Sequence, residues 1–474
     1  MVGKVGQLNI GIVFGIFILL ISAQLWTDGM FVDGVYYASI ARNLSEGIGS
    51  FWKLSFSATH DSEFYGHPPL AIGIQSILFK MFGDQFWVER VYSLLAYIVS
   101  GYLVIRIWTK LTQDASLSWI PLLLWFSIPT IQWAAANNIL ENTVTIFVLG
   151  ALFSIMMAEG KREYFWLAGA GLCILAGFLS KGFTALFPLA TPAVTYLIFR
   201  HRSLLHTTYT TLYILFWMVI PLSLWMYFDA KVYENLITYF QIQVLDSIEG
   251  RVNVASRWHI VIRMLEELLI PAIICLLILG IGRRWKVSNQ SVFYKNAIQF
   301  SIVGLCGVLP VMVSMKQSGF YIVPAFPVLT LGMALVLVPA GGAITQKWMS
   351  LPVFKRYQQA FFSVISVTVV VVAINLFGKI GRDQYFLEDW QLIRQELNSG
   401  TTINVCLKEE QIMNIQTYMS RYGKVSMENH LAQSHQFLLV QKEKLSECDV
   451  ENYSIVPLPT SHFDLFRSKK EKID

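Results

Sequence analysis

The chain contains 474 residues, of which 55% are hydrophobic and only 14% carry a charge. Soluble domains contain about 25% charged residues, so this composition excludes an ordinary soluble enzyme. Five cysteines are too few for a disulfide-rich scaffold, and a disordered chain would require low hydrophobicity. The net charge of +5 lies mainly in short loops between apolar segments, a pattern of membrane orientation rather than of nucleic-acid binding. The composition therefore predicts a polytopic membrane protein with no nucleic-acid partner.

Apolar segments long enough to cross a bilayer recur along most of the chain. A spanning helix requires about 20 predominantly apolar residues. The first such segment lacks a clear small-residue cleavage site, so we interpret it as a span and not as a removable signal peptide. We predict eleven spans, at residues 8–25, 88–107, 117–136, 139–158, 164–180, 183–199, 208–228, 260–281, 297–315, 320–340 and 359–380.

Basic residues predict the orientation of these spans. The short turns near 137–140, 181 and 316 contain few of them, and the alternate loops contain most. The positive-inside rule therefore places the amino terminus in the cytoplasm and, with an odd number of spans, the tail from about 381 outside. The predicted inner loops contain Lys4, Arg106, Lys110, Lys161, Arg162, Arg200, Arg202, Arg283, Arg284, Lys286, Lys295, Lys347, Lys355 and Arg356.

Three predicted outer segments are longer than a turn. Residues 26–87 are far longer than a helix connection requires, and long connections of this kind often carry function. Within them, VYYASIARNL and PLAIGIQSILFKMFG have helical spacing but are too short to span, so we expect helices that lie in the membrane interface. The second segment, 229–258, is mixed in polarity, and the third is the tail.

The tail has the pattern of a small α/β domain. The stretches TINVCLK and QFLLVQK alternate as strands do, and helical sequence lies around them. Cys406 and Cys448 lie in polar sequence, where a disulfide is possible but not implied. We therefore expect an all-α transmembrane domain over 1–380 and a soluble extracytoplasmic domain over 381–474.

Asp33 is the sharpest candidate for chemistry. It stands at the predicted start of the first interfacial helix, followed at helical spacing by Tyr36, Tyr37 and Arg42. One interpretation is an N-cap, because aspartate there accepts a backbone N–H bond and favours the helix dipole. The other is a general base at the membrane surface, and the two do not exclude each other.

Glu141 and His67 are the next candidates. Glu141 begins the fourth span, where an ionisable group usually faces a cavity or a partner, although a hydrogen-bonded interfacial glutamate is the plainer interpretation. His67 precedes two prolines that form a rigid corner, and a lone histidine is more often structural than a ligand. With His259 and Glu63 or Asp61 it is a weak candidate for a divalent metal site, because no ligand spacing supports one.

Lys181, Arg257 and Lys316 are basic residues at outer membrane edges, opposite to the orientation signal. Snorkelling toward the interface explains any one of them. Together with Arg42 they suggest an anionic head group, because phosphate recognition requires fixed positive charge.

An ordered set of motifs over about residues 8–340 resembles the GT-C superfamily of membrane glycosyltransferases. The resemblance is to bacterial relatives of dolichyl-phosphate-mannose protein mannosyltransferase and of the lipid A aminoarabinose transferase. The motifs are DGVYYASIARNL, YGHPPLAIG, ERVYSLLAYIVSG, NNILENTVTIF, LAGAGLCILAGFLSKG and SGFYIVPAFPVL.

This resemblance implies transfer of a sugar from a polyprenyl-phosphate donor to an extracytoplasmic acceptor, with inversion at the anomeric carbon. It places the family's general base on Asp33 and its second acidic position on Glu141. Donor-binding candidates are His67, Lys316, Lys181, Arg257, Arg42, Tyr37 and Tyr321. The aminoarabinose transferase has Glu-Lys where this chain has Gly66-His67, so metal dependence does not carry over; no cofactor is certain, and a divalent metal is possible.

The predicted partners are the lipid-linked donor, membrane lipid, and a glycolipid, protein or glycan acceptor, at a bacterial cytoplasmic membrane. A transporter or flippase for a lipid-linked sugar is the principal alternative. Transporters tend to have repeated halves and charges buried at mid-membrane, whereas here the ionisable residues cluster at one face. A lipid-linked polysaccharide ligase or polymerase is a nearer alternative.

Overall fold

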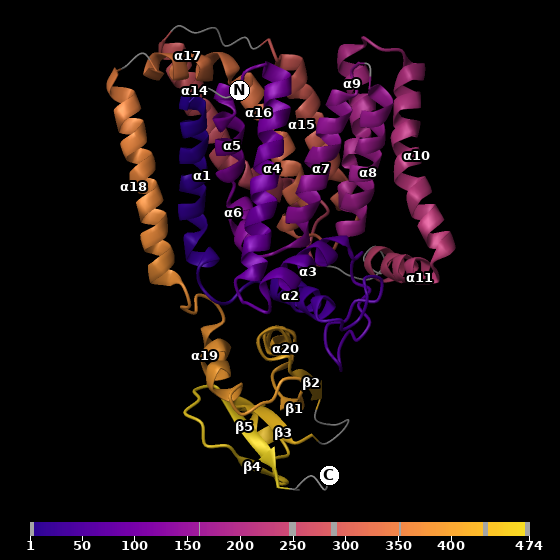
Figure 1. Ribbon diagram of the computed structural model, residues 1–474, viewed down its shortest axis with the longest axis vertical. Helices are drawn as coiled ribbons and strands as arrows, with labels where there is room; N and C mark the ends of the chain where they lie inside the picture. The colour runs from indigo at the N-terminus through magenta and orange to yellow at the C-terminus, as the bar shows by residue number, and fades with distance from the viewer. Residues whose placement is uncertain are drawn as a thin grey trace. The chain divides into compact units, whose positions relative to one another are not determined.

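The computed structural model describes residues 4–160, 162–245, 253–285, 292–349, 352–429 and 435–469. Two compact units make up the chain, and each contains segments that are distant in sequence (Figure 1). Unit 1 consists of Met1–Ser22, Gly66–Ala71 and Ser93–Asn375. Unit 2 consists of Ala23–Tyr65, Ile72–Tyr92 and Leu376–Asp474.

Unit 1 is a bundle of apolar helices. Within the described residues, eight helical segments are long and apolar enough to cross a membrane, which makes the chain a multi-pass membrane protein. They are built from α1 (Lys4–Leu25), α4 (Val88–Thr112), α7 (Leu140–Met157), α8 (Glu163–Lys181), α10 (Leu204–Phe228), α15 (Tyr294–Val308) with η5 (Leu309–Val313), η6 (Gly319–Ala325) with α16 (Phe326–Val336), and α18 (Pro352–Leu376).

The count of eleven straight spans is not confirmed, because three of the predicted segments are broken. The first pairs η1 (Ala115–Leu117) and α5 (Trp119–Phe126) with α6 (Pro129–Ala136), bent by 85°. The second pairs α13 (His259–Glu267) with α14 (Leu269–Arg284), bent by 41°. The third divides into η2 (Phe183–Ala185), η3 (Phe187–Ala190) and α9 (Thr191–Phe199). Proline disfavours helical backbone in the residue before it, so a helix often ends there. Hydropathy alone does not reveal such a break, because it carries no information on helix direction.

Helix α7 packs against α8, and α8 packs against α10. Their shared core consists of small and aliphatic side chains such as Ala151, Ala170 and Ile214. Gly171 permits the close approach of α8 and α10, because a Cβ there would lie 2.5 Å from the backbone oxygen of Ile214. The interface therefore depends on a small residue, as is common between membrane helices.

Different helices lie at the two ends of the bundle in unit 1. Figure 1 shows the start of α1 at the same end of the bundle as α9, α14 and α17 (Val338–Met349), whereas α11 (Ala230–Tyr239) lies toward the other end. The π-helix η4 (Phe240–Leu245) follows α11 in the chain. Arg200 follows α9 and Arg283 is in the last turn of α14, and the orientation prediction places both residues inside. Lys161 and Lys286, used in the same prediction, lie outside the described residues, as do residues 246–252 of the predicted outer segment 229–258.

Unit 2 contains a five-stranded mixed sheet, which confirms the small sheet domain predicted for the tail. The strand order is β2-β1-β3-β5-β4, with β1 parallel to β2 and β3, and β5 antiparallel to β3 and β4. The strands are β1 (Thr402–Cys406), β2 (Ser426–Asn429), β3 (Phe437–Gln441), β4 (Tyr453–Ile455) and β5 (Phe463–Ser468), with η7 (Lys442–Glu447) after β3.

Helices that accompany the sheet among the described residues of unit 2 include α2 (Val32–Ser45), most of α3 (Leu70–Phe82), α19 (Gln384–Ile393) and α20 (Glu409–Gly423). Both helices predicted in the first loop are present, and their position in the interface stays a prediction. Cys406 and Cys448 form a disulfide. The larger core of the unit combines tail residues with Met30 and Val35 from the first loop. The predicted domain division at residue 381 stays a prediction, but this core uses residues from both sides of it.

Candidate active site

A buried ion pair joins two of the predicted site residues in unit 1. The Lys181 ammonium contacts the Glu141 carboxylate, and the two residues are 8% and 0% exposed. Lys181 is therefore not a snorkelling anchor, because its charge lies inside the protein. Burying a charge is costly unless it is paired, so the position of each residue depends on the other.

Local sequence places both charges at helix ends that suit them. Glu141 is in the first turn of α7 and Lys181 is in the last turn of α8, so each complements its helix dipole. The turn before α7 requires Asn138 at φ 48°, a conformation that asparagine tolerates. The Asn142 side chain secures this turn by donating to the Ser93 hydroxyl and to the Ala134 carbonyl, at 2.8 Å each.

Aromatic rings surround the Lys181 ammonium and its backbone. The ammonium nitrogen lies 5.3 Å from the ring centroid of Phe320 and 5.2 Å from that of Tyr321, both within cation–π range. The Tyr239 hydroxyl donates to the Lys181 carbonyl at 3.2 Å. Gly182 makes this contact possible: its φ is 91°, and a Cβ there would lie 1.8 Å from the Tyr239 oxygen.

His67 and Lys316 belong to the same region of unit 1. The His67 ring centroid lies 6.4 Å from that of Tyr239. Burial, followed by the nearby ammonium groups of Lys181 and Lys316, holds the pKa of His67 well below its usual value. Half-buried Lys316 donates to the Gln243 side chain at 3.3 Å. The geometry thus gathers two cations and a neutral imidazole, which suits an anionic ligand.

Arg257 and His259 are two further predicted site residues. Both are exposed, and Arg257 donates to the Val313 carbonyl at 2.9 Å. Gln317, the neighbour of Lys316, donates to the Arg257 carbonyl at 3.1 Å. Glu63, the third weak metal candidate besides His67 and His259, belongs to unit 2, where it accepts hydrogen bonds from Tyr65 and Lys53. Within the part of the chain that the structure describes, no three His, Cys, Asp or Glu side chains are grouped to hold a metal ion.

Asp33 lies in the first turn of α2 in unit 2 and is partly exposed. The N-cap interpretation is wrong, because the N-cap of α2 is Phe31 and Asp33 lies inside the first turn. Buried Tyr36, one turn later, donates to Asp61 and stacks on Phe56 with ring centroids 4.0 Å apart. Burial, the Asp61 carboxylate and the charge of Asp33 raise the pKa of Tyr36, so its hydroxyl stays protonated.

Arg42 has a structural environment inside unit 2. Its guanidinium is 1% exposed and donates to the Ser420 carbonyl at 2.9 Å and to Asp84 at 3.2 Å. Arg421 also binds Asp84 and forms a two-point contact with Glu89 at 2.9 and 3.1 Å. Burial favours the protonated acid, but Arg421 and Arg42 hold the pKa of Asp84 below its usual value. Arg42 thus joins α2 to α20. Tyr37, another predicted donor-binding residue, is also in α2 and is buried.

The C-terminal helix α20 also holds the segment that enters α2. The Tyr418 hydroxyl accepts from the Met30 amide at 2.9 Å and donates to Asp383 at 2.6 Å. Met30 is three residues before Asp33. The tail therefore helps to set the position of the helix that carries this carboxylate.

Several residues of these networks escaped the sequence prediction. Tyr239 and Gln243 lie in a segment with no motif, and Phe320 lies in the motif SGFYIVPAFPVL, which does not single it out. Tyr418 and Arg421 lie in the tail, where helical spacing gives no sign of a partner in the first loop. The Lys-Gly pair at 181–182 was the one usable signal, because glycine after a helix often marks a special backbone conformation.

Comparison with known proteins supports the fold. The model of the dolichyl-phosphate-mannose-protein mannosyltransferase family matches residues 66–227, a range that includes His67, Glu141 and Lys181. An undecaprenyl phosphate-alpha-4-amino-4-deoxy-L-arabinose arabinosyl transferase from Proteus mirabilis (strain HI4320) is 25% identical over 186 residues. That match covers 38% of this chain and spans about a third (32%) of the relative.

Two crystal structures of ArnT from Cupriavidus metallidurans match nearly the whole chain. The form bound to undecaprenyl phosphate has a TM-score of 0.70 at 13% identity and covers 98% of both chains. The apo form has a TM-score of 0.68 at 13% identity and covers 96% of both chains. The chain has the GT-C fold. The GT-C fold that the motif resemblance predicted is therefore confirmed.

Proposed function

We propose that this GT-C protein is a glycosyltransferase that moves a sugar from a polyprenyl-phosphate donor to an acceptor on the outer face of a bacterial cytoplasmic membrane. Three features support the proposal: the fold, the family match over residues 66–227, and the anion-suited cluster in unit 1. The buried Lys181, with Glu141 and Lys316, is the observation that carries it. The donor, membrane lipid and a glycolipid, protein or glycan acceptor are the partners.

The cluster suits the departing lipid phosphate. Breaking the bond from the sugar to phosphate leaves negative charge on a phosphate oxygen, and cations fixed in a poorly hydrated site stabilise that charge as it develops. Glu141 balances much of the Lys181 charge, so the half-buried Lys316 supplies the excess positive charge. A neutral His67 can donate one hydrogen bond to phosphate, because its pKa is far below the working pH.

Asp33 is proposed as the general base. The acceptor's hydroxyl or amine attacks the anomeric carbon as the phosphate leaves from the opposite side, so the product is inverted. The attacking group's proton passes to the Asp33 carboxylate. Holding the two reactants in this geometry supplies much of the remaining acceleration.

An outward-facing unit 2 is also proposed. The Cys406–Cys448 disulfide supports it, because such bonds persist in the periplasm and are rare in the cytosol. The positive-inside rule supports the same orientation, because it assigns the basic loops to the cytoplasm and the tail to the outside. A cysteine replacing exposed Gln395 should react with a membrane-impermeant thiol reagent in spheroplasts, and protection from the reagent would reverse the assignment.

Transfer itself is tested with purified protein, several radiolabelled polyprenyl-phosphate sugars and extracted envelope fractions. We expect one fraction to become labelled by one donor. The Lys316→Ala variant should raise the KM for that donor, whereas Lys295→Ala, a basic residue outside the cluster, should not. Failure with every donor, with lipid-linked sugar still bound, would favour a transporter.

A further inference from the structure

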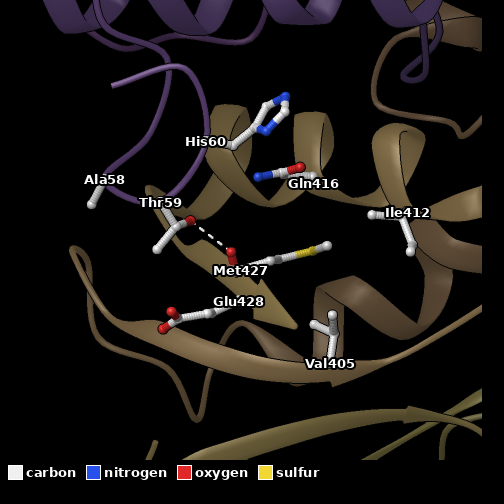
Figure 2. Close-up of a pocket in the computed structure, with 8 residues that line it drawn as sticks. All are labelled: Ala58, Thr59, His60, Val405, Ile412, Gln416, Met427 and Glu428. Carbon is white, nitrogen blue, oxygen red and sulfur yellow. Dashed lines mark hydrogen bonds between the residues drawn. The ribbon is translucent and has the colours of Figure 1, made fainter. Parts of the chain in front are cut away.

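Unit 2 contains a cavity of about 410 Å³ between the first loop and the tail (Figure 2). This volume lies within the usual range of small-molecule sites. One wall is the loop segment 58–60, and the opposite wall consists of β1, β2 and α20. The lining residues are Ala58, Thr59, His60, Val405, Ile412, Gln416, Met427 and Glu428.

Direct hydrogen bonds fix the wall that the loop provides. The Thr59 hydroxyl donates to the Met427 carbonyl at 2.6 Å, and the Ala58 amide donates to the Ser426 hydroxyl at 3.1 Å. Because β2 is the edge strand of the sheet, these bonds hold the loop against an edge that is otherwise open to pairing. The cavity is therefore a built feature of unit 2.

The Gln416 side chain points to a ligand. It is 5% exposed, and Figure 2 shows its amide beside the His60 ring, directed into the cavity. Among the residues that the structure describes, its side chain has no hydrogen-bond partner. Buried side-chain amides in folded proteins almost always have one. The Gln416 amide lines the cavity, so a polar group of a ligand can bind it there.

The lining also selects the charge of that ligand. Glu428 is the charged residue of the lining, its carboxylate lies 2.5 Å from His435, and no lysine or arginine is among the described lining residues. A phosphate or carboxylate would meet repulsion without a compensating cation. Val405, Ile412 and Met427 offer an apolar surface instead, which suits the C–H face of a sugar ring while Gln416 and His60 bind hydroxyl groups.

We propose that this cavity binds a neutral or amine-bearing saccharide unit of the acceptor. The assignment of this saccharide to the acceptor rests on the proposed function, whereas saccharide binding itself does not. The link between the two is α20, which contributes Ile412 and Gln416 to the cavity and Tyr418 to the bonds that hold Met30. A saccharide bound here is thus held by the same unit that carries Asp33.

The test measures binding to the intact protein in nanodiscs by saturation-transfer NMR, with glucose, galactose, glucosamine, N-acetylglucosamine and glucuronate as probes. At least one uncharged or amino sugar should bind, and glucuronate should bind more weakly. Gln416→Leu should weaken binding about tenfold, as expected for loss of one well-placed hydrogen bond. Ile412→Phe, which fills the cavity, should abolish it. Gln395→Leu is the matched control, because Gln395 is an exposed glutamine just after α19, and it should leave sugar binding unchanged.

Each other outcome is informative. No sugar binding to the wild-type protein, or equal binding by the Gln416→Leu and Ile412→Phe variants, would overturn the proposal. Tightest binding of glucuronate would overturn the predicted charge. In the transfer assay, Gln416→Leu should raise the KM for acceptor and leave that for donor unchanged; an unchanged acceptor KM would assign the cavity to free sugars and refute the acceptor role. Asp33→Asn should bind sugars normally. Saccharide binding by the wild-type protein without any transfer would remove the proposed function and leave the saccharide site standing.

Discussion

Replacing Lys181 with methionine separates the structural role of the buried ion pair from its chemical role. Glu141 is 0% exposed, so the variant keeps a fully buried carboxylate that has lost the balancing ammonium. Removing one partner of a buried pair costs about 3–5 kcal/mol. The double variant Glu141→Gln with Lys181→Met removes both charges at similar volume, and it should recover most of the lost free energy of unfolding.

Catalysis should not recover with stability. The double variant lacks the ammonium proposed to stabilise the leaving phosphate, so its transfer rate should stay near that of the Lys181→Met variant. Denaturant unfolding in detergent gives the stability, and transfer of labelled sugar gives the rate. Wild-type transfer by the double variant would show that Lys181 only balances Glu141. A Lys181→Met variant as stable as wild type would refute the burial of the pair.

Three further predictions concern neighbouring features. Gly182→Ala should displace Tyr239 from the Lys181 carbonyl, because the added Cβ would lie 1.8 Å from the tyrosine oxygen. The free energy of unfolding should fall by about 1–3 kcal/mol, since the backbone there is strained for any residue with a Cβ. Gly280→Ala is the control, because a Cβ added there meets no atom within 4 Å. The pKa of His67 is lowered in the folded protein, so as pH falls the unfolded chain takes up this proton first, at about pH 6.5. The free energy of unfolding should therefore fall as pH drops below about 6.5. His67→Asn should remove that part of the pH dependence. Tyr418→Phe should lower kcat by loosening the entry to α2 without changing the KM for donor, and Tyr422→Phe on the same helix should not; equal effects of the two variants would refute this positioning role.

Sequence patterns reveal the features that depend on local periodicity. The helices α2 and α3 follow from apolar spacing in the first loop, and β1 and β3 follow from alternation in the tail. The start of α2 differs from the prediction of Asp33 as its N-cap. Helical conformation begins at Val32, one residue before Asp33, so Phe31 is the N-cap. The same reasoning also missed the 85° bend before Pro129, since a proline permits either a kink or a new helix.

Partnerships between distant residues lay beyond that reasoning. Glu141 and Lys181 were each placed at an outer helix end, but their pairing depends on how α7 packs against α8. Arg42 had the charge expected of a phosphate ligand, yet it binds carbonyls of a helix almost 380 residues later in the chain. Nothing in the pattern around Arg42 distinguishes a buried structural arginine from a ligand-binding one. Long-range packing decides that choice.

The most direct test of the account is the transfer rate of the Asp33→Asn variant in purified protein that retains donor binding. Asparagine keeps the shape of the side chain and cannot accept the proton, so we expect transfer to fall by about 10²–10⁴-fold while the unfolding midpoint stays that of wild type. Transfer at the wild-type rate would contradict the assignment of Asp33 as the base.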